Sequence, residues 1–337
     1  MSLLEVVELT AGYHTEEGFA RAVHNVSFSI EPGENLGIVG ESGCGKSSLT
    51  RAIIRVFPRT FSIERGRVRL LDRDLTGLSE AEMRRVRWKK VSYIPQSAMN
   101  ALNPVYTVGQ QIAEPIQEHE SVSRREARRR VKEVLEWVGI DPERIDQYPH
   151  QFSGGMRQRV SIASALSLEP DLIIADEPTT ALDVIVQAHI FQKLREMQTR
   201  TGASLLLVTH DISLVAENCA RVAVMYAGCI VEYGHATQVL VDPCHPYTMG
   251  LRHAFPSVDR SDELELVSIH GAPPSLVEPA PGCQFANRCP FATEVCARET
   301  PTLDEVEPGH FAACHHSADD DQMREQASHR RTWEYFG

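Results

Sequence analysis

The chain has 337 residues, a length that allows one large α/β domain, a smaller appendage and a fully buried core. Its 34 lysines and arginines are outnumbered by 46 aspartates and glutamates, which gives a formal net charge of −12. This balance excludes a chain-wide basic surface, so we expect no nucleic-acid partner. The N-terminus lacks the charged and apolar profile of a signal peptide, and no run of 18 apolar residues occurs. We therefore expect a chain that is neither exported nor membrane-spanning.

Apolar periodicity and turn residues predict alternating strands and helices along the chain. Strands are expected at 6–9, 22–30, 36–39, 91–94, 172–175, 204–209 and 221–226, and helices at 46–56, 127–138 and 184–200. Ser123 and Glu126 have the spacing of a capping box before the second of these helices. Because strands alternate with helices, we predict an α/β fold with a mainly parallel sheet covered by helices.

The character of the sequence changes twice, which suggests how the chain is divided. Between about 96 and 155 the pattern is mostly helical, and we interpret this stretch as a helical subdomain. From about residue 243 prolines become frequent, and a cluster of cysteines follows. We therefore place one domain at 1–242, a small cysteine-rich C-terminal extension at 243–316, and a loosely ordered tail at 317–337.

A glycine-rich loop connects the predicted strand at 36–39 to the next helix. It reads Gly40-Glu41-Ser42-Gly43-Cys44-Gly45-Lys46-Ser47-Ser48. Its three glycines let consecutive N–H groups face inward and hold phosphates at the positive end of the helix. Lys46 would bind the β- and γ-phosphates, and the Ser47 hydroxyl would bind Mg²⁺. A strand before the loop and a helix after it favour an ATP-binding site over an ordinary turn, so we predict ATP and Mg²⁺ as ligands.

Two carboxylates follow the apolar strand at 172–175. Asp176 is placed where a carboxylate reaches Mg²⁺ through water, and Glu177 could accept a proton from an attacking water. An acidic pair at a strand end can also be a solvated loop or a helix cap, but the phosphate loop favours the catalytic interpretation. Between the loop and this pair the chain reads Ser153-Gly154-Gly155-Met156-Arg157-Gln158.

With these motifs in this order, residues 3 to about 240 resemble the ATP-binding subunits of ABC transporters. The resemblance implies ATP hydrolysis by a cassette with a mainly parallel sheet core, an antiparallel β subdomain and a helical subdomain. Met156 departs from the family pattern, which more usually has glutamine at that position.

The resemblance also implies roles for individual residues. Tyr13 would stack on adenine, although an aromatic residue at this place in a strand is a core residue at least as often. Gln96 would sense Mg²⁺ and the attacking water, and His210 would hold the γ-phosphate and that water. Together with Glu177 these two would be catalytic, and Mg²⁺ would be held through Ser47, Gln96 and Asp176.

A partner cassette is also implied. Ser153, Gly154, Gly155 and Gln158 would face the ATP of the opposite cassette, and Asp183 would couple the two sites across the dimer. ATP would close the pair and hydrolysis would open it. We expect the partner to be a second, homologous ATP-binding subunit that is not identical to this chain. The pair would act at the cytoplasmic face of the cell membrane on two transmembrane permease subunits, and indirectly with an extracytoplasmic solute-binding protein.

The C-terminal extension narrows the resemblance to one branch. The segments His245-Pro246-Tyr247-Thr248, Cys283-Gln284-Phe285-Ala286-Asn287-Arg288-Cys289-Pro290 and Cys314-His315 are similar to the extension of oligopeptide, dipeptide and nickel importers. This implies import of peptides or a related solute. The alternative is a soluble ABC ATPase that acts on ribosomes or DNA. A single cassette without a heptad run argues against that alternative.

The last four cysteines form a candidate metal site. Cys283, Cys289, Cys296 and Cys314 have the spacing C-x5-C-x6-C-x17-C, which lacks the close pair typical of structural zinc. Wider loops suit a [4Fe–4S] cluster, although the spacing also departs from that of ferredoxins. Zinc, with His310, His315 or His316 as substitute ligands, remains an alternative, as do disulfides or free thiols. We expect the cluster to stabilise the extension; a metal or redox sensor that controls the ATPase is a further hypothesis.

Overall fold

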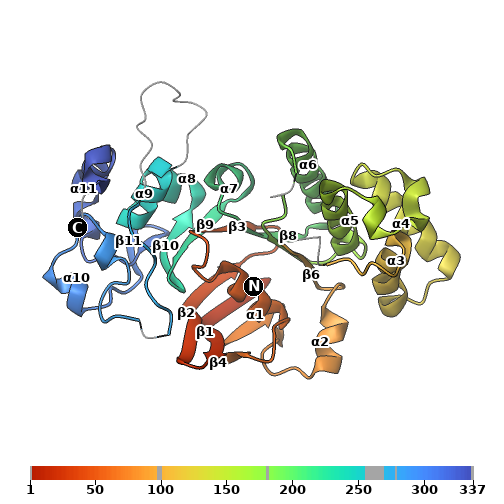
Figure 1. Ribbon diagram of the computed structural model, residues 1–337, viewed down its shortest axis with the longest axis horizontal. Helices are drawn as coiled ribbons and strands as arrows, with labels where there is room; N and C mark the ends of the chain where they lie inside the picture. Colours follow the sequence, from red (N-terminus) through yellow and green to blue (C-terminus); the bar gives the residue numbers. More distant parts are fainter. Residues whose placement is uncertain (1, 97–100, 180–181, 255–268, 278, 335–337) are drawn as a thin grey trace. The chain divides into compact units, whose positions relative to one another are not determined.

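The computed structural model describes residues 2–96, 101–179, 182–254, 269–277 and 279–334 (Figure 1). The chain divides into two compact units, each assembled from segments that are far apart in the sequence. Unit 1 consists of Met1–Leu3, Ile30–Glu34 and Arg73–Leu207. Unit 2 consists of Leu4–Ser29, Asn35–Asp72 and Val208–Gly337.

Unit 1 contains three neighbouring strands and most of the long helices. The strands lie in the order β8 (Ser204–Val208), β7 (Leu172–Asp176), β6 (Val91–Ile94), and β6 and β7 are parallel. The side chains of β7 and β8 are all buried, as expected for strands covered on both faces. The remaining elements are β5 (Arg73–Asp74), α2 (Glu80–Val86), α3 (Val108–His119), α4 (Arg124–Trp137), α5 (Gly154–Leu166) and α6 (Val184–Thr201).

Helices dominate the segment that follows β6. α3, α4 and α5 pack against one another (Figure 1), with the short 3₁₀ turns η1 (Pro142–Asp146) and η2 (Pro149–Gln151) between α4 and α5. Side chains define where two of these helices begin. Thr107 and Gln110 form a capping box at α3, and Ser123 accepts the N–H of Glu126 at α4.

Unit 2 begins with an antiparallel sheet. Its strands lie in the order β2 (Gly18–Ile30), β1 (Leu4–Thr15), β4 (Phe61–Leu70), and β1 and β4 are antiparallel with irregular register near Thr10. α1 (Lys46–Ile54) packs against β1 (Figure 1). This sheet is the antiparallel β subdomain that the family resemblance implied.

A second sheet in unit 2 combines strands from both ends of the chain. The strands of this sheet that belong to unit 2 lie in the order β11 (Asp304–Glu307), β12 (His310–Ala312), β10 (Cys229–His235), β9 (Arg221–Tyr226), β3 (Asn35–Val39). β3 and β9 are parallel, and β10 is antiparallel to both β9 and β12. α7 (Ile212–Asn218) and α8 (Ala236–Val241) are the helices of this part of the chain. Because β12 extends the sheet that includes β3, the C-terminal extension is part of unit 2 and is not a separate appendage.

The end of the chain is helical, which corrects the expectation of a loosely ordered tail at 317–337. In the described residues to 334, η4 (Ser317–Asp319), α11 (Asp320–Ala327) and η5 (Arg330–Trp333) follow one another. Trp333 is 3% exposed and donates to the carbonyl of Ala327 (2.8 Å). α11 packs against α9 (Pro246–Ala254), as Figure 1 shows. Asp319, Asp320 and Asp321 lie at the N-terminus of α11, where negative charge stabilises a helix.

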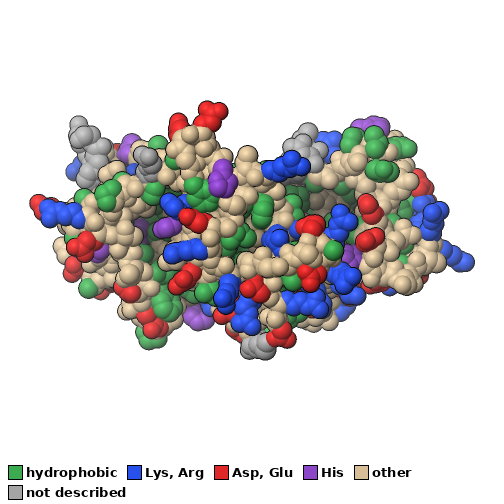
Figure 2. Space-filling model, turned by 90° about the horizontal axis from the view of Figure 1, so that it is seen from below, with side chains coloured by type: hydrophobic (Ala, Val, Ile, Leu, Met, Phe, Trp, Pro, Cys, Tyr) green, Lys and Arg blue, Asp and Glu red, His purple; other side chains and the backbone are tan. Residues whose placement is uncertain are grey.

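The surface of the molecule carries charges of both signs. On the face seen in Figure 2, lysine and arginine side chains are interspersed with aspartate and glutamate, without a continuous field of either sign.

Two short elements of the extension, η3 (Ala286–Arg288) and α10 (Glu294–Arg298), complete the structure. Among the described residues, no helix is long and apolar enough to cross a membrane.

Candidate functional site

The glycine-rich loop connects β3 to α1 within unit 2, and its glycines are required by space and backbone conformation. Gly40 and Gly45 have φ angles of 154° and 108°. A Cβ on Gly40 would lie 2.2 Å from the carbonyl oxygen of Met225, and one on Gly45 would lie 1.9 Å from that of Ala22. Gly43 has a φ of 83° but open space around it. Gly43 is therefore needed for its left-handed backbone, and the other two also for close packing.

Lys46 places its charge inside the loop. Its side chain donates to the carbonyl oxygens of Gly40 (2.7 Å) and Glu41 (2.9 Å), and the residue is only 6% exposed. It is also the first residue of α1, whose N-cap, Gly45, offers no side chain to cap the helix. A buried ammonium and a helix N-terminus at one loop together favour the binding of an anion.

Tyr13 lies beside the helix that follows this loop. Its hydroxyl is 3.2 Å from the Ser48 hydroxyl, and its half-buried ring packs edge-on against Phe61, with centroids 4.8 Å apart. These contacts place it next to the predicted phosphate site. Its proposed stacking on adenine remains a prediction.

His210 is held near the strand that leads into the loop. The N–H of Thr209 donates to the carbonyl of Ile38 in β3 (3.1 Å), and the Thr209 hydroxyl accepts the N–H of Asp211 (3.0 Å). The Asp211 carboxylate in turn caps α7. His210 is exposed between these two fixed neighbours.

The predicted acidic pair lies at the end of β7 in unit 1. Asp176 is fully buried and accepts a hydrogen bond from the Tyr93 hydroxyl (2.9 Å). Glu177 is 9% exposed and has a φ of 47°, in the left-handed region. Gln96 donates to its carboxylate (2.8 Å), so the structure brings two of the predicted catalytic residues together. A left-handed non-glycine residue costs about 1–3 kcal/mol and is common at functional sites.

The motif Ser153 to Gln158, at the start of α5, is divided between the exposed end of the helix and the interior. Ser153 is the N-cap of α5, and its hydroxyl accepts the N–H of Met156 (3.3 Å). Gln158, in contrast, is 1% exposed, and its amide donates to the carbonyls of Pro178 (2.8 Å) and Pro95 (3.4 Å). This corrects the expectation that Gln158 faces a partner's nucleotide: its amide is used to join two loops of unit 1.

Asp183 is the N-cap of α6. Its carboxylate accepts the N–H of Val186 (3.0 Å). The next two residues, Val184 and Ile185, are 79% and 82% exposed. The predicted coupling residue therefore lies beside two exposed apolar side chains.

The four cysteines of the candidate metal site all belong to unit 2. The N–H of Cys283 donates to the carbonyl of Cys296 (2.7 Å), which joins two of them through the backbone. Burial raises the pKa of Cys289 well above its usual value and raises that of Cys314 to about 11. The thiolate charges of Cys283 and Cys296 raise both pKa values further. The four side chains therefore lie within electrostatic range of one another. All eight cysteines of the chain are described, and none forms a disulfide.

A second group of metal-ligating residues was not predicted as a site from the sequence. The ligand atoms of Glu232, Cys244 and His310, all buried, lie within 4.8 Å of one another. Glu232 accepts the N–H groups of Cys244 (2.7 Å) and His245 (3.1 Å), and its carboxylate is 2.7 Å from His310 Nε2. The Cys244 thiol donates to Asp320 (3.1 Å). Because protein groups already satisfy these atoms, we interpret the group as a structural network.

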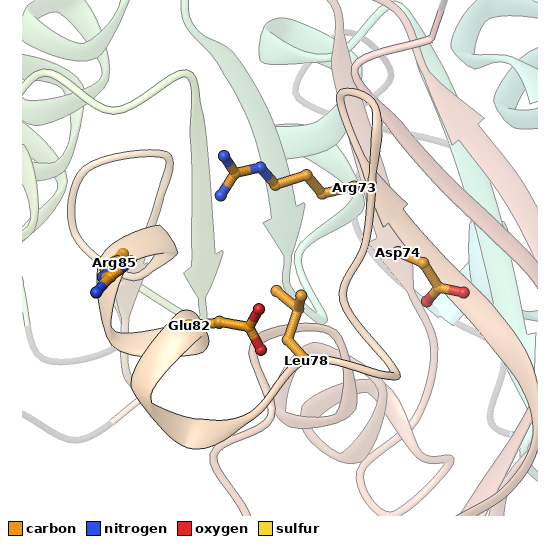
Figure 3. Close-up of a pocket in the computed structure, with 5 residues that line it drawn as sticks. All are labelled: Arg73, Asp74, Leu78, Glu82 and Arg85. Carbon is orange, nitrogen blue, oxygen red and sulfur yellow. The ribbon is translucent and has the colours of Figure 1, made fainter.

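A hollow of about 350 Å³ in unit 1 lies apart from the predicted residues. It is lined by Arg73, Asp74, Leu78, Glu82 and Arg85 (Figure 3). Its carboxylates are used locally: Asp74 accepts the N–H of Thr76 (2.9 Å), and Glu82 accepts that of Ser79 (2.7 Å) in the capping box of α2. Figure 3 shows Asp74 and Glu82 on separate segments. These local hydrogen bonds account for the two carboxylates, and we assign the hollow no function.

Comparison with known proteins finds relatives along most of the chain. Residues 23–180 match the family described as ABC transporter, and residues 231–296 match the oligopeptide/dipeptide transporter, C-terminal region. The probable peptide ABC transporter ATP-binding protein y4tR of Sinorhizobium fredii is 49% identical, over 93% of this chain and 94% of that protein. The dipeptide transport ATP-binding protein DppD of Bacillus subtilis is 46% identical, with the same two coverages.

Two solved structures share the fold. The dimeric post-hydrolysis state of the ATP-binding cassette MJ0796 bound to ADP and Pi has a TM-score of 0.64 and 28% identity, over 69% of this chain and 98% of that one. CbiO1 of Clostridium perfringens, part of the ABC transporter complex cbiONQ, has a TM-score of 0.60 and 28% identity, over 72% and 91% of the two chains. The predicted fold class, a cassette of the ABC-ATPase type, is confirmed.

The buried histidine at the start of α9 predicts a pH dependence of stability. His245 Nδ1 accepts the N–H of Tyr247 (3.0 Å), and burial lowers the pKa of His245 from 6.5 to about 3. The unfolded chain therefore binds one more proton than the folded chain between these pH values, so stability should fall as pH decreases below 6.5. The slope from this residue should approach about tenfold in the unfolding constant per pH unit.

His245→Asn keeps an acceptor for the Tyr247 N–H but removes the titrating ring. Chemical denaturation from pH 7.5 to 4.5 should show a shallower loss of stability in this variant than in the wild type. Equal slopes in the two proteins would contradict the assignment.

Proposed function

Because the chain belongs to the ATP-binding subunits of ABC transporters and is an ATPase, we propose that it provides the energy for importing peptides across a membrane. Relatives named as peptide or dipeptide transport subunits match nearly its whole length, which supports this proposal. The C-terminal match to a family of oligopeptide and dipeptide transporters supports it independently of the cassette. The chain would act at the cytoplasmic face of the membrane.

The observation that supports the catalytic proposal most directly is the position of Glu177. Its backbone is in the left-handed region, and its buried carboxylate accepts a hydrogen bond from Gln96. In this position it would accept the proton of the water that attacks the γ-phosphate. Ser47, Gln96 and Asp176 would hold Mg²⁺, and when bound the ion would supply positive charge to the phosphates. His210 would hold the γ-phosphate and orient the water.

The residues of the glycine-rich loop would bind the phosphates. Gly40, Ser42, Gly43, Cys44 and Gly45 would offer backbone N–H groups, followed by Lys46, Ser47 and Ser48 at the start of α1. Lys46 would exchange its contacts with loop carbonyls for contacts with phosphate oxygens. Tyr13 would stack on the adenine.

We propose that the working unit is a pair of cassettes. Ser153, Gly154 and Gly155 form the N-terminus of α5, whose positive end suits a phosphate bound by the partner cassette. Asp183 would couple the two sites, and the exposed Val184 and Ile185 beside it suit a protein contact. The partner would be a second, non-identical ATP-binding subunit. Two transmembrane permeases and, indirectly, an extracytoplasmic solute-binding protein would complete the importer.

We also propose that Cys283, Cys289, Cys296 and Cys314 hold a [4Fe–4S] cluster, with zinc as the alternative. Four thiolates are a suitable donor set for either. The cysteine spacing in the sequence lacks the close pair typical of structural zinc, and its wide loops suit the larger cluster. When bound, the cluster would cross-link the extension through its thiolates.

The first prediction from the proposed function concerns its general base, Glu177. Glu177→Gln should leave ATP binding nearly unchanged and lower turnover by about 10²–10⁴, the usual effect of losing a general base. Because hydrolysis opens the pair, the variant assembled with its partner cassette should accumulate as a closed pair with ATP. Steady-state ATPase assays and size-exclusion chromatography with ATP measure these effects. Glu169→Gln is a matched control, since Glu169 also has a φ of 47° but is exposed and paired with Arg200. Wild-type turnover in Glu177→Gln would refute the assignment.

A second prediction concerns the assembly. Affinity purification of the tagged chain from detergent-solubilised membranes should recover one non-identical ATP-binding subunit and two integral permeases, identified by mass spectrometry. Peptides presented to the assembled complex should stimulate its ATPase. Two copies of this chain without a second cassette would refute the mixed pair. Recovery of ribosomes or DNA without permeases would instead favour a soluble ABC ATPase.

The third prediction concerns the cysteines. Anaerobically purified protein should be brown and contain roughly four irons per chain, the content of one [4Fe–4S] cluster. Cys289→Ala should lose this iron and increase hydrogen exchange in the extension, whereas Cys219→Ala, another buried cysteine, should not. A colourless protein with one zinc per chain would overturn the cluster but keep the structural role.

A further inference from the structure

Arg288 connects the cysteine-containing part of the extension to the glycine-rich loop. It is the last residue of η3, directly before Cys289, and its side chain is 5% exposed. Its Nη1 and Nη2 atoms donate to the two carboxylate oxygens of Glu41, at 2.8 and 3.0 Å. Glu41 is the second residue of the loop that begins at Gly40. A bidentate ion pair therefore joins two segments that are 247 positions apart in the sequence.

The guanidinium of Arg288 is held in one orientation. Its Nε atom donates to the carbonyl of His270 (2.9 Å), and Nη2 also donates to that of Ile269 (3.2 Å). Nη1 makes a further contact with the Tyr226 hydroxyl (3.3 Å). A planar guanidinium with directed N–H groups fixes the position of its carboxylate partner more strictly than a lysine would.

Glu41 is held on its backbone as well as on its side chain. Its N–H donates to the Tyr247 hydroxyl (2.8 Å), and its carbonyl accepts from Lys46 (2.9 Å). Tyr247 is fully buried and belongs to the His-Pro-Tyr-Thr segment of the extension. The Glu41 carbonyl also accepts the N–H of Cys44 within the loop (3.3 Å). Two partners of Glu41, Arg288 and Tyr247, therefore come from the extension, and another, Lys46, is the lysine proposed to bind the phosphates.

The charge of Glu41 also matters for a loop that binds an anion. Its side chain is 27% exposed, so water screens the carboxylate only partly. Without a cation beside it, this carboxylate would repel the phosphates of a nucleotide. Arg288 supplies that cation from a nearly buried position, where a charge left without its partner is strongly unfavourable.

We propose that Arg288 is a positioning residue for nucleotide binding. By pairing with Glu41 it neutralises the acidic residue of the loop, and together with Tyr247 it holds the loop in the conformation that receives phosphates. The affinity for ATP then depends on the folded C-terminal extension. This inference rests on the proposed role of residues 40–48 as the phosphate loop.

The test compares charge-pair variants in the full-length protein. Arg288→Ala should raise both the KM and the Kd for ATP about tenfold and leave kcat within about twofold, because ground state and transition state lose the same interaction. Arg288→Lys keeps the positive charge but not the bidentate N–H geometry of the guanidinium, and should raise the KM for ATP about threefold. Adding Glu41→Gln to Arg288→Ala removes the unpaired carboxylate and should return KM to within about threefold of the wild-type value.

Two controls distinguish this positioning role from a general loss of positive charge and from partial unfolding. Arg298→Ala removes an exposed arginine of α10, paired with Glu294 in the same extension, and should change neither KM nor kcat. If Arg288→Ala only unfolded part of the population, kcat would fall at constant KM and the double variant would not recover, which would overturn the inference.

Lys46→Ala tests the premise that residues 40–48 bind the phosphates. If Lys46→Ala weakens nucleotide binding and Arg288→Ala does not, the positioning role of Arg288 is wrong. If Lys46→Ala leaves nucleotide binding unchanged, residues 40–48 are not the phosphate loop, and the premise of the inference is wrong too.

Discussion

A buried charge needs partners, and in unit 2 this requirement holds the C-terminal extension to the rest of the fold. Glu232 of β10 is fully buried and accepts the N–H groups of Cys244 and His245 at the start of the extension. It also contacts His310, in the strand β12 that pairs with β10. A carboxylate without partners is strongly disfavoured in a core. Separating either the segment that begins at Cys244 or the strand β12 from β10 would therefore carry a large free-energy cost. The extension and the strands around β3 therefore fold as one unit.

The same requirement links the extension to the proposed nucleotide site. Glu41 is an unfavourable residue for a loop that binds phosphates unless its charge is neutralised. The neutralising residue, Arg288, comes from the extension and is itself nearly buried, so each member of the pair depends on the other. A loop sequence that is unfavourable by itself becomes compatible with anion binding in the context of the whole unit.

Local sequence patterns predicted the elements that carry the motifs. The elements that these patterns missed have an interrupted apolar alternation or depend on contacts between residues far apart in the sequence. The strand expected at 36–39 is β3, and its position between a turn and a glycine-rich loop was sufficient to identify it. β4 (Phe61–Leu70) was not predicted, since its exposed arginines and Gly66 interrupt the apolar alternation. The helical tail was missed because its few apolar residues, such as Trp333, become significant only once α9 covers them. Spacing in the sequence likewise could not reveal that Arg288 contacts Glu41.

Gln158 shows how an interior residue can connect the motifs of unit 1. It lies on α5, whose N-terminus at Ser153 is proposed to contact the partner's nucleotide. Its amide donates to the carbonyls of Pro178 and Pro95, which directly neighbour Glu177 and Gln96. Hydrogen bonds weaken steeply with distance and angle, so α5 cannot shift without straining or breaking these two. The helix that would contact the partner and the two residues proposed for hydrolysis are thus joined through one buried side chain.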